Sequence, residues 1–113
     1  MIKTDDFEIG KNIKGRARTA ARAVVKFLKA EQVALDGGGC QAFFSADEWA
    51  KRGERFGTKS VLVLCHDGGI LSTYCDLNSG AYHAQERFSA WLAEEGLYVE
   101  ACTAWYSAIY EAG

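Results

Sequence analysis

The sequence predicts an α+β fold: one small domain, residues 1–113, with a mainly antiparallel sheet of three to five strands backed by about three helices. Three observations lead to this class. A helical hydrophobic pattern fills the first third of the chain, apolar runs flank the turn signal Asp67-Gly68-Gly69, and a second helical pattern precedes an aromatic-rich strand pattern. Strands joined partly by a hairpin and partly through helices are typical of α+β domains, here in the order (β)αβαββαβ. A length of 113 residues corresponds to a single domain.

The N-terminal third is expected to hold a short strand followed by a long amphipathic helix. The strand is Asp6–Ile9, and the helix runs from Asn12 or Gly15 to Ala34. The three glycines Gly37–Gly39 end it, because glycine is costly in a helix. Apolar positions share one side of this helix: Ile13, Ala17, Ala21, Val24, Phe27 and Leu28.

The next segment is read as a short strand and a short helix. Cys40–Phe44 is the strand. Ser45 and Glu48 have the spacing of a capping box, in which each side chain accepts a hydrogen bond from the backbone of the other residue. The helix should therefore run from Ala46 to about Arg55, with Trp49 as its main apolar anchor.

The middle of the chain is predicted to form a β-hairpin. Val61–Cys65 is a continuous apolar run with β-branched residues, which indicates a strand covered on both faces. The turn at Asp67–Gly69 should return Ile70–Cys75 antiparallel beside it.

The last third is predicted to be a helix followed by a strand. The helix spans Ala81–Glu95, with N-cap candidates in Asn78–Gly80 and Gly96 in a left-handed C-terminal cap. Leu97–Tyr110 then alternates as a strand, although the period after Thr103 also fits a helix. The core is expected to include Val63, Phe88, Trp91 and Leu92.

Charge is divided unequally along the chain. Residues 1–60 carry twelve bases and eight acids, a net +4, whereas residues 61–113 carry one base and seven acids, a net −6. At about 100° per helical residue, six bases fall within an arc of about 120°, opposite the apolar side. These bases are Lys11, Lys14, Arg18, Arg22, Lys26 and Lys29.

This basic stripe has three interpretations: a solvated face, a contact with nucleic-acid phosphates, or a docking face for an acidic protein surface. The acidic second half favours a protein partner, since a dedicated duplex binder is usually basic overall. Tyr98, Tyr106 and Tyr110, with Trp105 beside them, either pack in the core or contact a partner. The predicted partner-binding residues are the six stripe bases and these three tyrosines.

The sequence contains little that indicates a catalytic or metal-binding site. In Cys65-His66-Asp67, the cysteine and histidine end a strand and the aspartate starts the turn; successive strand side chains point to opposite faces, so Cys65 and His66 cannot easily share a hydrogen bond. The four cysteines and two histidines lack the paired spacing of zinc sites, so no metal and no cofactor is expected. Since no secretory signal or membrane span is visible, we expect a cytoplasmic protein with free thiols.

The leading functional hypothesis is a non-enzymatic cytosolic binding protein that occupies a surface of another macromolecule. One version is a phage- or plasmid-type inhibitor of a host nucleic-acid machine, such as a CRISPR effector or restriction enzyme. The alternative is direct nucleic-acid binding through the basic helix. A third hypothesis is a small enzyme that uses Cys65 or Cys102 with His66 or His83.

Overall fold

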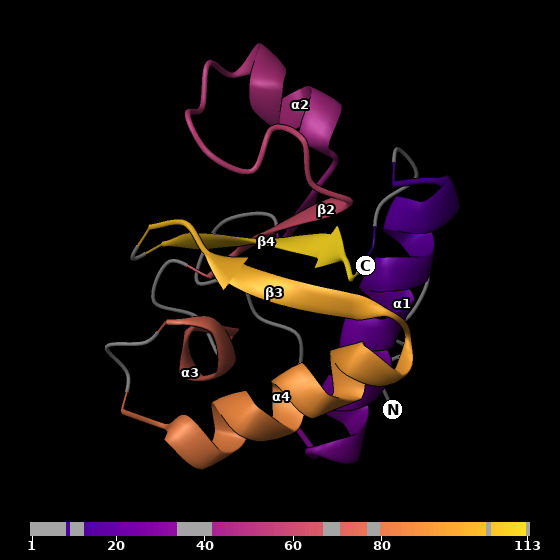
Figure 1. The fold of residues 1–113 in the computed structure, drawn as a ribbon, viewed down its shortest axis with the longest axis vertical. Coiled ribbons are helices and arrows are strands. Elements are labelled where there is room, and N and C mark those ends of the chain that lie inside the picture. The colour runs from indigo at the N-terminus through magenta and orange to yellow at the C-terminus, as the bar shows by residue number, and fades with distance from the viewer. Residues whose placement is uncertain are drawn as a thin grey trace.

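The computed structural model describes residues 9, 13–33, 42–66, 71–76, 80–103 and 105–112. These residues form an α+β domain of four helices and a four-stranded antiparallel sheet, which confirms the predicted class (Figure 1). The elements follow in the order α1 (Gly15–Ala30), β1 (Phe43–Phe44), α2 (Ala46–Lys51), β2 (Leu62–Cys65), α3 (Leu71–Cys75), α4 (Tyr82–Glu94), β3 (Leu97–Ala101) and β4 (Tyr106–Glu111). The Cα radius of gyration, 12.6 Å, fits one compact domain of this length, for which about 13 Å is expected.

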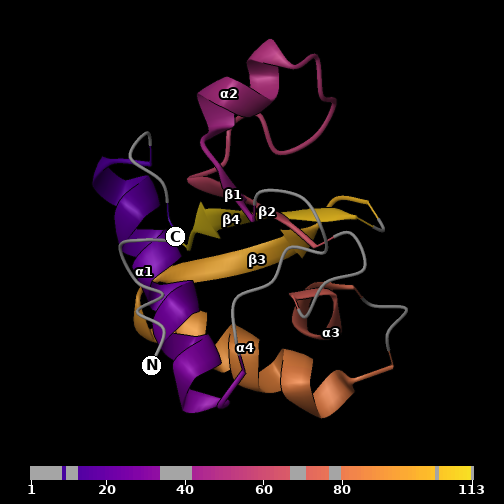
Figure 2. The ribbon, with the colours of Figure 1, turned by 180° about the vertical axis from the view of Figure 1, so that it is seen from behind.

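The sheet has the strand order β1-β2-β4-β3, so that β2 and β4 are central and β1 and β3 are its edges. Every pair is antiparallel; Val63 lies opposite Ala108, and Val99 lies opposite Ile109. In Figures 1 and 2, α2 lies above the sheet, α3 and α4 lie below it, and α1 crosses at one end of the strands.

Because side chains alternate along a strand, the two sheet faces bury two separate clusters. The larger cluster packs Leu62, Leu64 and Ile109 against the apolar sides of α1 and α4. The smaller one, called the outer cluster, contains Trp49, Val63, Cys65 and Tyr106, with Phe44, Cys102 and Trp105 packed against it. All of β2 is therefore buried, as its continuous apolar run predicts.

The basic helix is confirmed, but its end differs from the prediction. It stops at Ala30 instead of Ala34, because Gln32 adopts a left-handed φ of 63°. The Val33 N–H then donates to the Leu28 carbonyl at 2.9 Å and the Gln32 N–H to the Lys29 carbonyl at 3.0 Å, the pattern of a Schellman motif. Gly37–Gly39 lie outside the described residues.

The predicted hairpin between Val61–Cys65 and Ile70–Cys75 is wrong. Residues 71–75 form α3, in which Leu71, Tyr74 and Cys75 are buried with helical spacing. The two sides of β2 are already occupied by β1 and β4, so no edge remains for a further strand. The expected turn residues, 67–69, lie outside the described part of the chain.

The predicted single strand Leu97–Tyr110 is instead a hairpin of β3 and β4. Its turn is organised by Thr103, whose Oγ accepts hydrogen bonds of 3.2 Å from the backbone N–H groups of Trp105 and Tyr106. The segment after Thr103 is a strand and not a helix, as preferred from the sequence.

The remaining boundaries agree closely with the sequence. Ser45 and Glu48 form the predicted capping box, although α2 ends at Lys51 and not near Arg55. Helix α4 ends before Gly96, which has a left-handed φ of 70°. Its N-cap is Ala81, without a side-chain hydrogen bond; Asn78 and Ser79 lie outside the described residues.

Three of the four expected core residues, Val63, Phe88 and Leu92, are fully buried. Trp91 is partly exposed; it packs on Phe27 and donates its indole N–H to the Ala23 carbonyl at 3.0 Å. Of the predicted opening strand only Ile9 is described, and it is buried in a turn. Cys40 and Gln41 of the next predicted strand are outside the described residues, and β1 is limited to Phe43–Phe44.

Candidate binding surfaces

Helix α1 presents a cationic surface, which we call the basic face: Lys14, Arg18, Arg22, Lys26 and Lys29. Four of these residues are exposed and Arg18 is partly exposed. Lys14 and Lys26 take part in no ion pair with the described residues. The sixth predicted residue of the stripe, Lys11, lies outside the described part of the chain. Because four of its five residues are exposed, the basic face can be reached from solvent.

The opposite side of α1 is fixed to the domain. The predicted apolar residues Ile13, Ala21, Val24, Phe27 and Leu28 are buried, and Ala17 packs against the same core. Near its N-terminus, Arg16 donates to the Glu95 carbonyl at 2.9 Å and pairs with Glu111 at 3.4 Å. Arg16 thus contributes to the attachment of α1 and not to the basic face.

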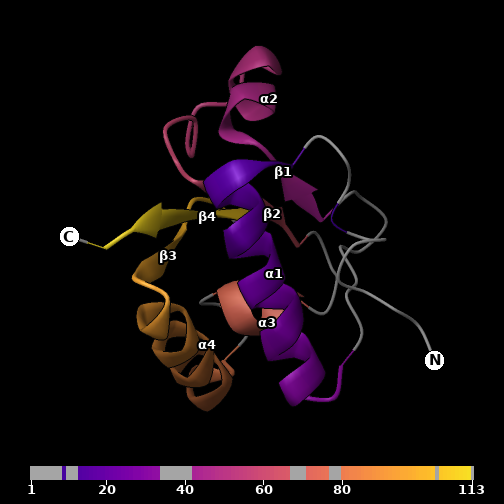
Figure 3. The ribbon, with the colours of Figure 1, turned by 90° about the vertical axis from the view of Figure 1, so that its right-hand side faces the viewer.

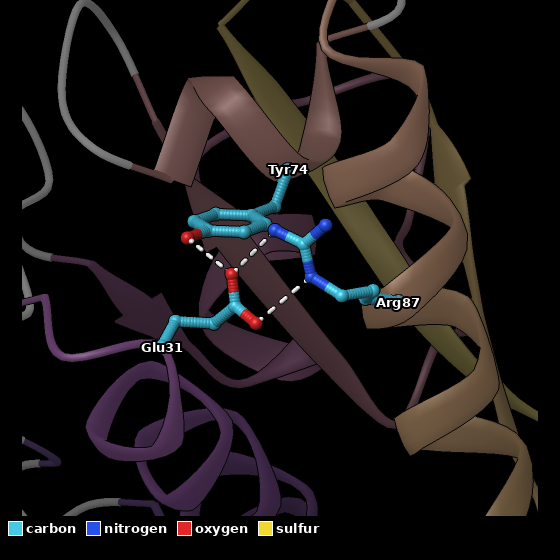
Figure 4. A network of polar contacts seen from close by, with 3 residues as sticks. All are labelled: Glu31, Tyr74 and Arg87. Carbon is cyan, nitrogen blue, oxygen red and sulfur yellow. Dashed lines mark hydrogen bonds and ion pairs between the residues drawn. The ribbon is translucent and has the colours of Figure 1, made fainter.

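The C-terminal end of α1 is attached by a polar network (Figure 4). Glu31 accepts hydrogen bonds of 3.0 Å from Arg87 Nε and 2.7 Å from Arg87 Nη2, both from α4. Tyr74 of α3 donates its hydroxyl to the same carboxylate at 3.2 Å. With both ends and one side fixed, α1 holds the basic face in one orientation.

The network also changes the acidity of its members. The hydrogen bond from Arg87 lowers the pKa of Glu31 below its ordinary value. The same bond raises the pKa of Arg87, whereas burial and then the hydrogen bond to Glu31 raise the pKa of Tyr74. At neutral pH, Glu31 is therefore ionised, and its charge is paired with that of Arg87.

The three predicted tyrosines are divided between the core and the surface. Tyr106 is 2% exposed; its ring packs at 4.9 Å against Trp49, and its hydroxyl accepts the Phe56 N–H at 3.3 Å. It is therefore a structural residue and inaccessible to a partner. Tyr98 and Tyr110 lie opposite each other on β3 and β4 with their rings stacked at 5.5 Å.

This stacked pair lies on the face of the sheet that carries α2. Tyr98 is 45% exposed and its neighbour Glu100 is exposed. Burial raises the pKa of Tyr110, with smaller contributions from Cys102 and Glu100. Aromatic rings beside a carboxylate form a surface suited to a cationic group.

Cys65 and His66 do not have the geometry of a catalytic pair, because their side chains lie on opposite faces of the sheet. Cys65 belongs to the outer cluster, while His66 Nε2 lies 2.9 Å from Ser107 Oγ, and Ser107 is opposite Leu64 on the other sheet face. The separation predicted for successive strand residues is confirmed. Asp67 is outside the described residues, and His83 is exposed on α4.

Two further observations apply only to the part of the chain that the structure describes. It contains no group of three or more His, Cys, Asp or Glu side chains placed to hold a metal ion. No helix in it combines the length and the apolar character needed to span a bilayer.

The polar network of Glu31, Tyr74 and Arg87 was not predicted, since its members are distant in sequence. A hollow beside β3, lined by residues of α3, α4 and β3, was also missed, because β3 and β4 were read as one strand. Two signals for the polar network were available in the sequence. Glu31 directly follows the basic helix, and Arg87 is the only base of residues 61–113. No protein-family model, no curated protein and no solved structure matches this chain.

Proposed function

We propose that the protein is a non-enzymatic binding protein whose basic face on α1 docks on an acidic surface of a protein partner. The observation that carries the proposal is the arrangement of α1. Its apolar side and both ends are fixed to the domain, while every charged residue from Lys14 to Lys29 is a base. Fixed charges of one sign orient a partner and increase the rate of association.

A protein partner is preferred over nucleic acid because the rest of the domain is acidic. Residues 80–112 contain five acids and the single base Arg87, and Arg87 is already paired with Glu31. A long polyanion such as nucleic acid would contact this acidic region as well as α1 and be repelled by it. An acidic protein patch of limited size can contact α1 alone. The chain has a net charge of −2, unlike a typical duplex-binding domain.

The specific version of this proposal is an inhibitor of a host nucleic-acid machine, such as a CRISPR effector or restriction enzyme. In that version, the acidic residues take the place of phosphates in a basic channel, and the basic face contacts an acidic rim. The proposed location is the cytoplasm, where the free thiols of Cys65, Cys75 and Cys102 stay reduced.

The thiol environments support this proposal over a Cys-dependent enzyme. Burial raises the pKa of Cys75 to about 12, and burial and Glu100 raise the pKa of Cys102. A nucleophilic cysteine needs the opposite shift, because the thiolate is the reactive form. Cys65 is 1% exposed, so its thiol does not lie at the surface.

The test compares two triple charge reversals. Arg18→Glu, Arg22→Glu and Lys26→Glu alter the basic face, whereas Lys51→Glu, Arg55→Glu and Lys59→Glu make the same charge change at exposed positions in and after α2. A partner is first captured from a plausible host lysate by the wild-type protein and identified by mass spectrometry. Affinity is then measured by calorimetry at low and high salt.

The basic-face variant should bind roughly tenfold or more weakly and show a smaller salt dependence. The α2 variant should bind like the wild type. Equal affinities for all three proteins at low salt would mean that the basic face is only solvated surface. The α2 variant should keep the wild-type unfolding temperature within a few degrees, since exposed charges contribute little to stability. The basic-face variant also loses the hydrogen bond of 3.2 Å from Arg18 Nη1 to the Ile13 carbonyl, so it should unfold at a slightly lower temperature.

Direct nucleic-acid binding is the second candidate, favoured by the row of bases along one helix. Fluorescence anisotropy with labelled single-stranded and duplex oligonucleotides tests it. If nucleic acid is the partner, the basic-face variant should lose affinity for all sequences alike and show a lower salt slope.

A further inference from the structure

Strand β3 has one edge that no other described strand occupies. It is the last strand in the order β1-β2-β4-β3, so none of the described strands pairs with its far side; Figure 3 shows it next to β4 with α4 below. The Ala112 N–H donates to the Gly96 carbonyl at 2.8 Å, and the Cys102 N–H donates to the Tyr106 carbonyl at 3.2 Å. On the β3 side, the residues that make these two bonds are Gly96 and Cys102, both of which have even numbers.

This register decides which backbone groups face the open edge. In an antiparallel ladder, alternate residues bond to the neighbouring strand and those between point away. Tyr98 and Glu100 therefore bond to β4, while Leu97, Val99 and Ala101 direct their N–H and C=O groups to the open edge. Ala101 is exposed and Val99 is partly exposed, so the outward groups of these two residues can be reached by a second chain, whereas Leu97 is buried.

A hollow of about 360 Å³ runs beside this edge. Tyr74 and Cys75 of α3, Gln85 and Ser89 of α4, and Val99, Glu100 and Ala101 of β3 line it. Figure 1 shows α3 and α4 passing beneath β3, so that the edge and the helices form two sides of the space. Gln85 fixes the helical wall, because its Nε2 donates to the Asp76 carbonyl at 2.8 Å, joining α4 to the end of α3.

The other face of β3 is negative and aromatic. The side chains of Tyr98, stacked on Tyr110, and of Glu100 alternate with those of Val99 and Ala101, so they lie on the sheet face that carries α2. Glu100, between Val99 and Ala101 at the edge, borders the hollow as well. A guanidinium group placed there can lie over the Tyr98 ring and pair with the Glu100 carboxylate.

We propose that the open edge of β3 binds an extended, arginine-bearing segment of a protein partner by strand addition. The backbone of the segment pairs with the outward groups of Val99 and Ala101. Every second side chain enters the hollow, and the alternate ones, including arginine, lie beside Tyr98 and Glu100. This surface is separate from the basic face, so it can fail without affecting the proposed function.

Charge argues for a basic segment and against a second copy of this chain. Two β3 strands paired about Val99 would place two regions, each with five acids and one base, side by side. Like charges across such an interface are unfavourable, whereas a basic segment is attracted. The single occupant is therefore a cationic peptide in extended conformation.

The probe is a blocked eight-residue peptide of alternating arginine and valine, with a glutamate–valine peptide of the same length as control. Binding to the full-length protein is measured by calorimetry and by NMR amide shifts. The arginine peptide should bind and the glutamate peptide should not. The largest shifts and the new hydrogen-exchange protection should fall on the amides of Val99 and Ala101.

The decisive variant is Ala101→Pro. Proline removes the outward N–H donor at an exposed position and leaves the bonds from β3 to β4 intact, so the sheet should persist. Affinity for the arginine peptide should fall tenfold or more. Tyr98→Ala and Glu100→Gln should each weaken binding severalfold, while the matched changes Tyr82→Ala and Glu86→Gln, both at exposed α4 positions, should not.

Several results would overturn the proposal. If Glu86→Gln weakens binding as much as Glu100→Gln, the attraction is general and not localised at β3. If the free protein is a dimer that Ala101→Pro converts to a monomer, the occupant is a second copy. Should Ala101→Pro unfold, the wild-type amide map decides alone, and shifts centred on another element contradict the assignment. The charge reversal on α1 should leave peptide binding intact, which separates this test from that of the basic face.

Discussion

Arg87 of α4 holds the Glu31 carboxylate at the C-terminal cap of α1 in a two-point contact, with hydrogen bonds of 2.7 Å and 3.0 Å (Figure 4). The pairing joins residues 56 positions apart in the sequence. Because Tyr74 of α3 donates to the same carboxylate, one acid connects three helices. The orientation of the basic face therefore depends partly on the ionisation of Glu31.

The first prediction concerns pH. The folded-state pKa of Glu31 is lowered, chiefly by Arg87, so the pair stabilises the protein fully above the unfolded-state pKa of about 4.3. This contribution is lost as pH falls through the folded-state pKa. Glu31→Gln should accordingly lower the unfolding temperature near neutral pH and make its fall on acidification less steep.

Thermal unfolding followed by circular dichroism across the acidic range checks this expectation. Glu86→Gln is the matched control, since Glu86 is an exposed glutamate on α4 that makes none of the described ion pairs. Its pH profile should follow the wild type. An unchanged profile in Glu31→Gln would show that Glu31 does not titrate in the folded protein with a lowered pKa.

The second prediction uses two glycines with the same backbone conformation and different surroundings. Gly57 has φ +79°, and a Cβ there would lie 3.3 Å from Ala108 Cβ and 3.5 Å from Val63 Cγ2. Gly53 has φ +83° and nothing within 4 Å. Gly53→Ala should cost about 1–2 kcal/mol for the left-handed conformation alone.

Gly57→Ala should cost this amount and a further ~1–3 kcal/mol for the forced contact with the sheet. Urea denaturation of both variants measures the difference directly. Equal losses would mean that the segment over Ala108 moves away at no cost. That result would contradict the close packing of this segment on the sheet.

Local chemistry allowed the sequence to predict several helix boundaries. The capping box of Ser45 and Glu48 and the left-handed Gly96 depend only on neighbouring residues, and both are confirmed. The buried side of α1 was predictable for the same reason, since its period is regular over sixteen residues. Gln32 was missed as the end of α1 because a left-handed glutamine has no compositional signal.

Strand pairing could not be predicted, because it is decided by distant residues. Residues 71–75 are too few to distinguish the hydrophobic period of a strand, two residues, from that of a helix, 3.6 residues. The sequence also does not show that β1 and β4 occupy both sides of β2. Residues 102–105 contain no Gly, Pro, Asn or Asp, so the turn formed by the Thr103 hydroxyl was hidden. Which of the three tyrosines is buried depends on that turn, which pairs Tyr98 with Tyr110, and on α2, which covers Tyr106.

The third prediction concerns the attachment of α2. Trp49 is fully buried and packs against Phe44 at 4.9 Å, Tyr106 at 4.9 Å and Trp105 at 5.6 Å. Trp49→Ala should cost about 3–5 kcal/mol, since α2 has no other buried side chain. The Trp49 indole N–H finds no acceptor among the described residues, so Trp49→Phe loses packing but no hydrogen bond.

We therefore expect Trp49→Phe to retain most of the stability that Trp49→Ala loses. Urea unfolding checks both variants. Trp91→Phe provides the contrast, because its indole N–H donates to the Ala23 carbonyl, which would be left without that donor. Equal losses in Trp49→Phe and Trp49→Ala would indicate a hydrogen bond of the Trp49 indole that contributes to stability.

The last prediction orders the thiols by reactivity. Cys75 is 5% exposed with a pKa raised to about 12 by burial, whereas Cys102 is only partly buried. Alkylation of the native protein with iodoacetamide should modify Cys102 before the buried Cys65 and Cys75, yet more slowly than an unfolded thiol, because its pKa is also raised. Peptide mapping by mass spectrometry over time measures each rate, and in denaturant the rates should converge.

Glu100 makes this order a test of the surface around β3. The carboxylate of Glu100 contributes to the raised pKa of Cys102, so Glu100→Gln should lower that pKa and speed the alkylation of Cys102 at mildly alkaline pH. Glu86→Gln should leave the rate unchanged. If Cys75 reacts as fast as Cys102, the packing of α3 against the core is looser than its burial indicates. If Glu100→Gln has no effect on Cys102, Glu100 directs its charge away from this face, and an arginine beside Tyr98 would lack its partner.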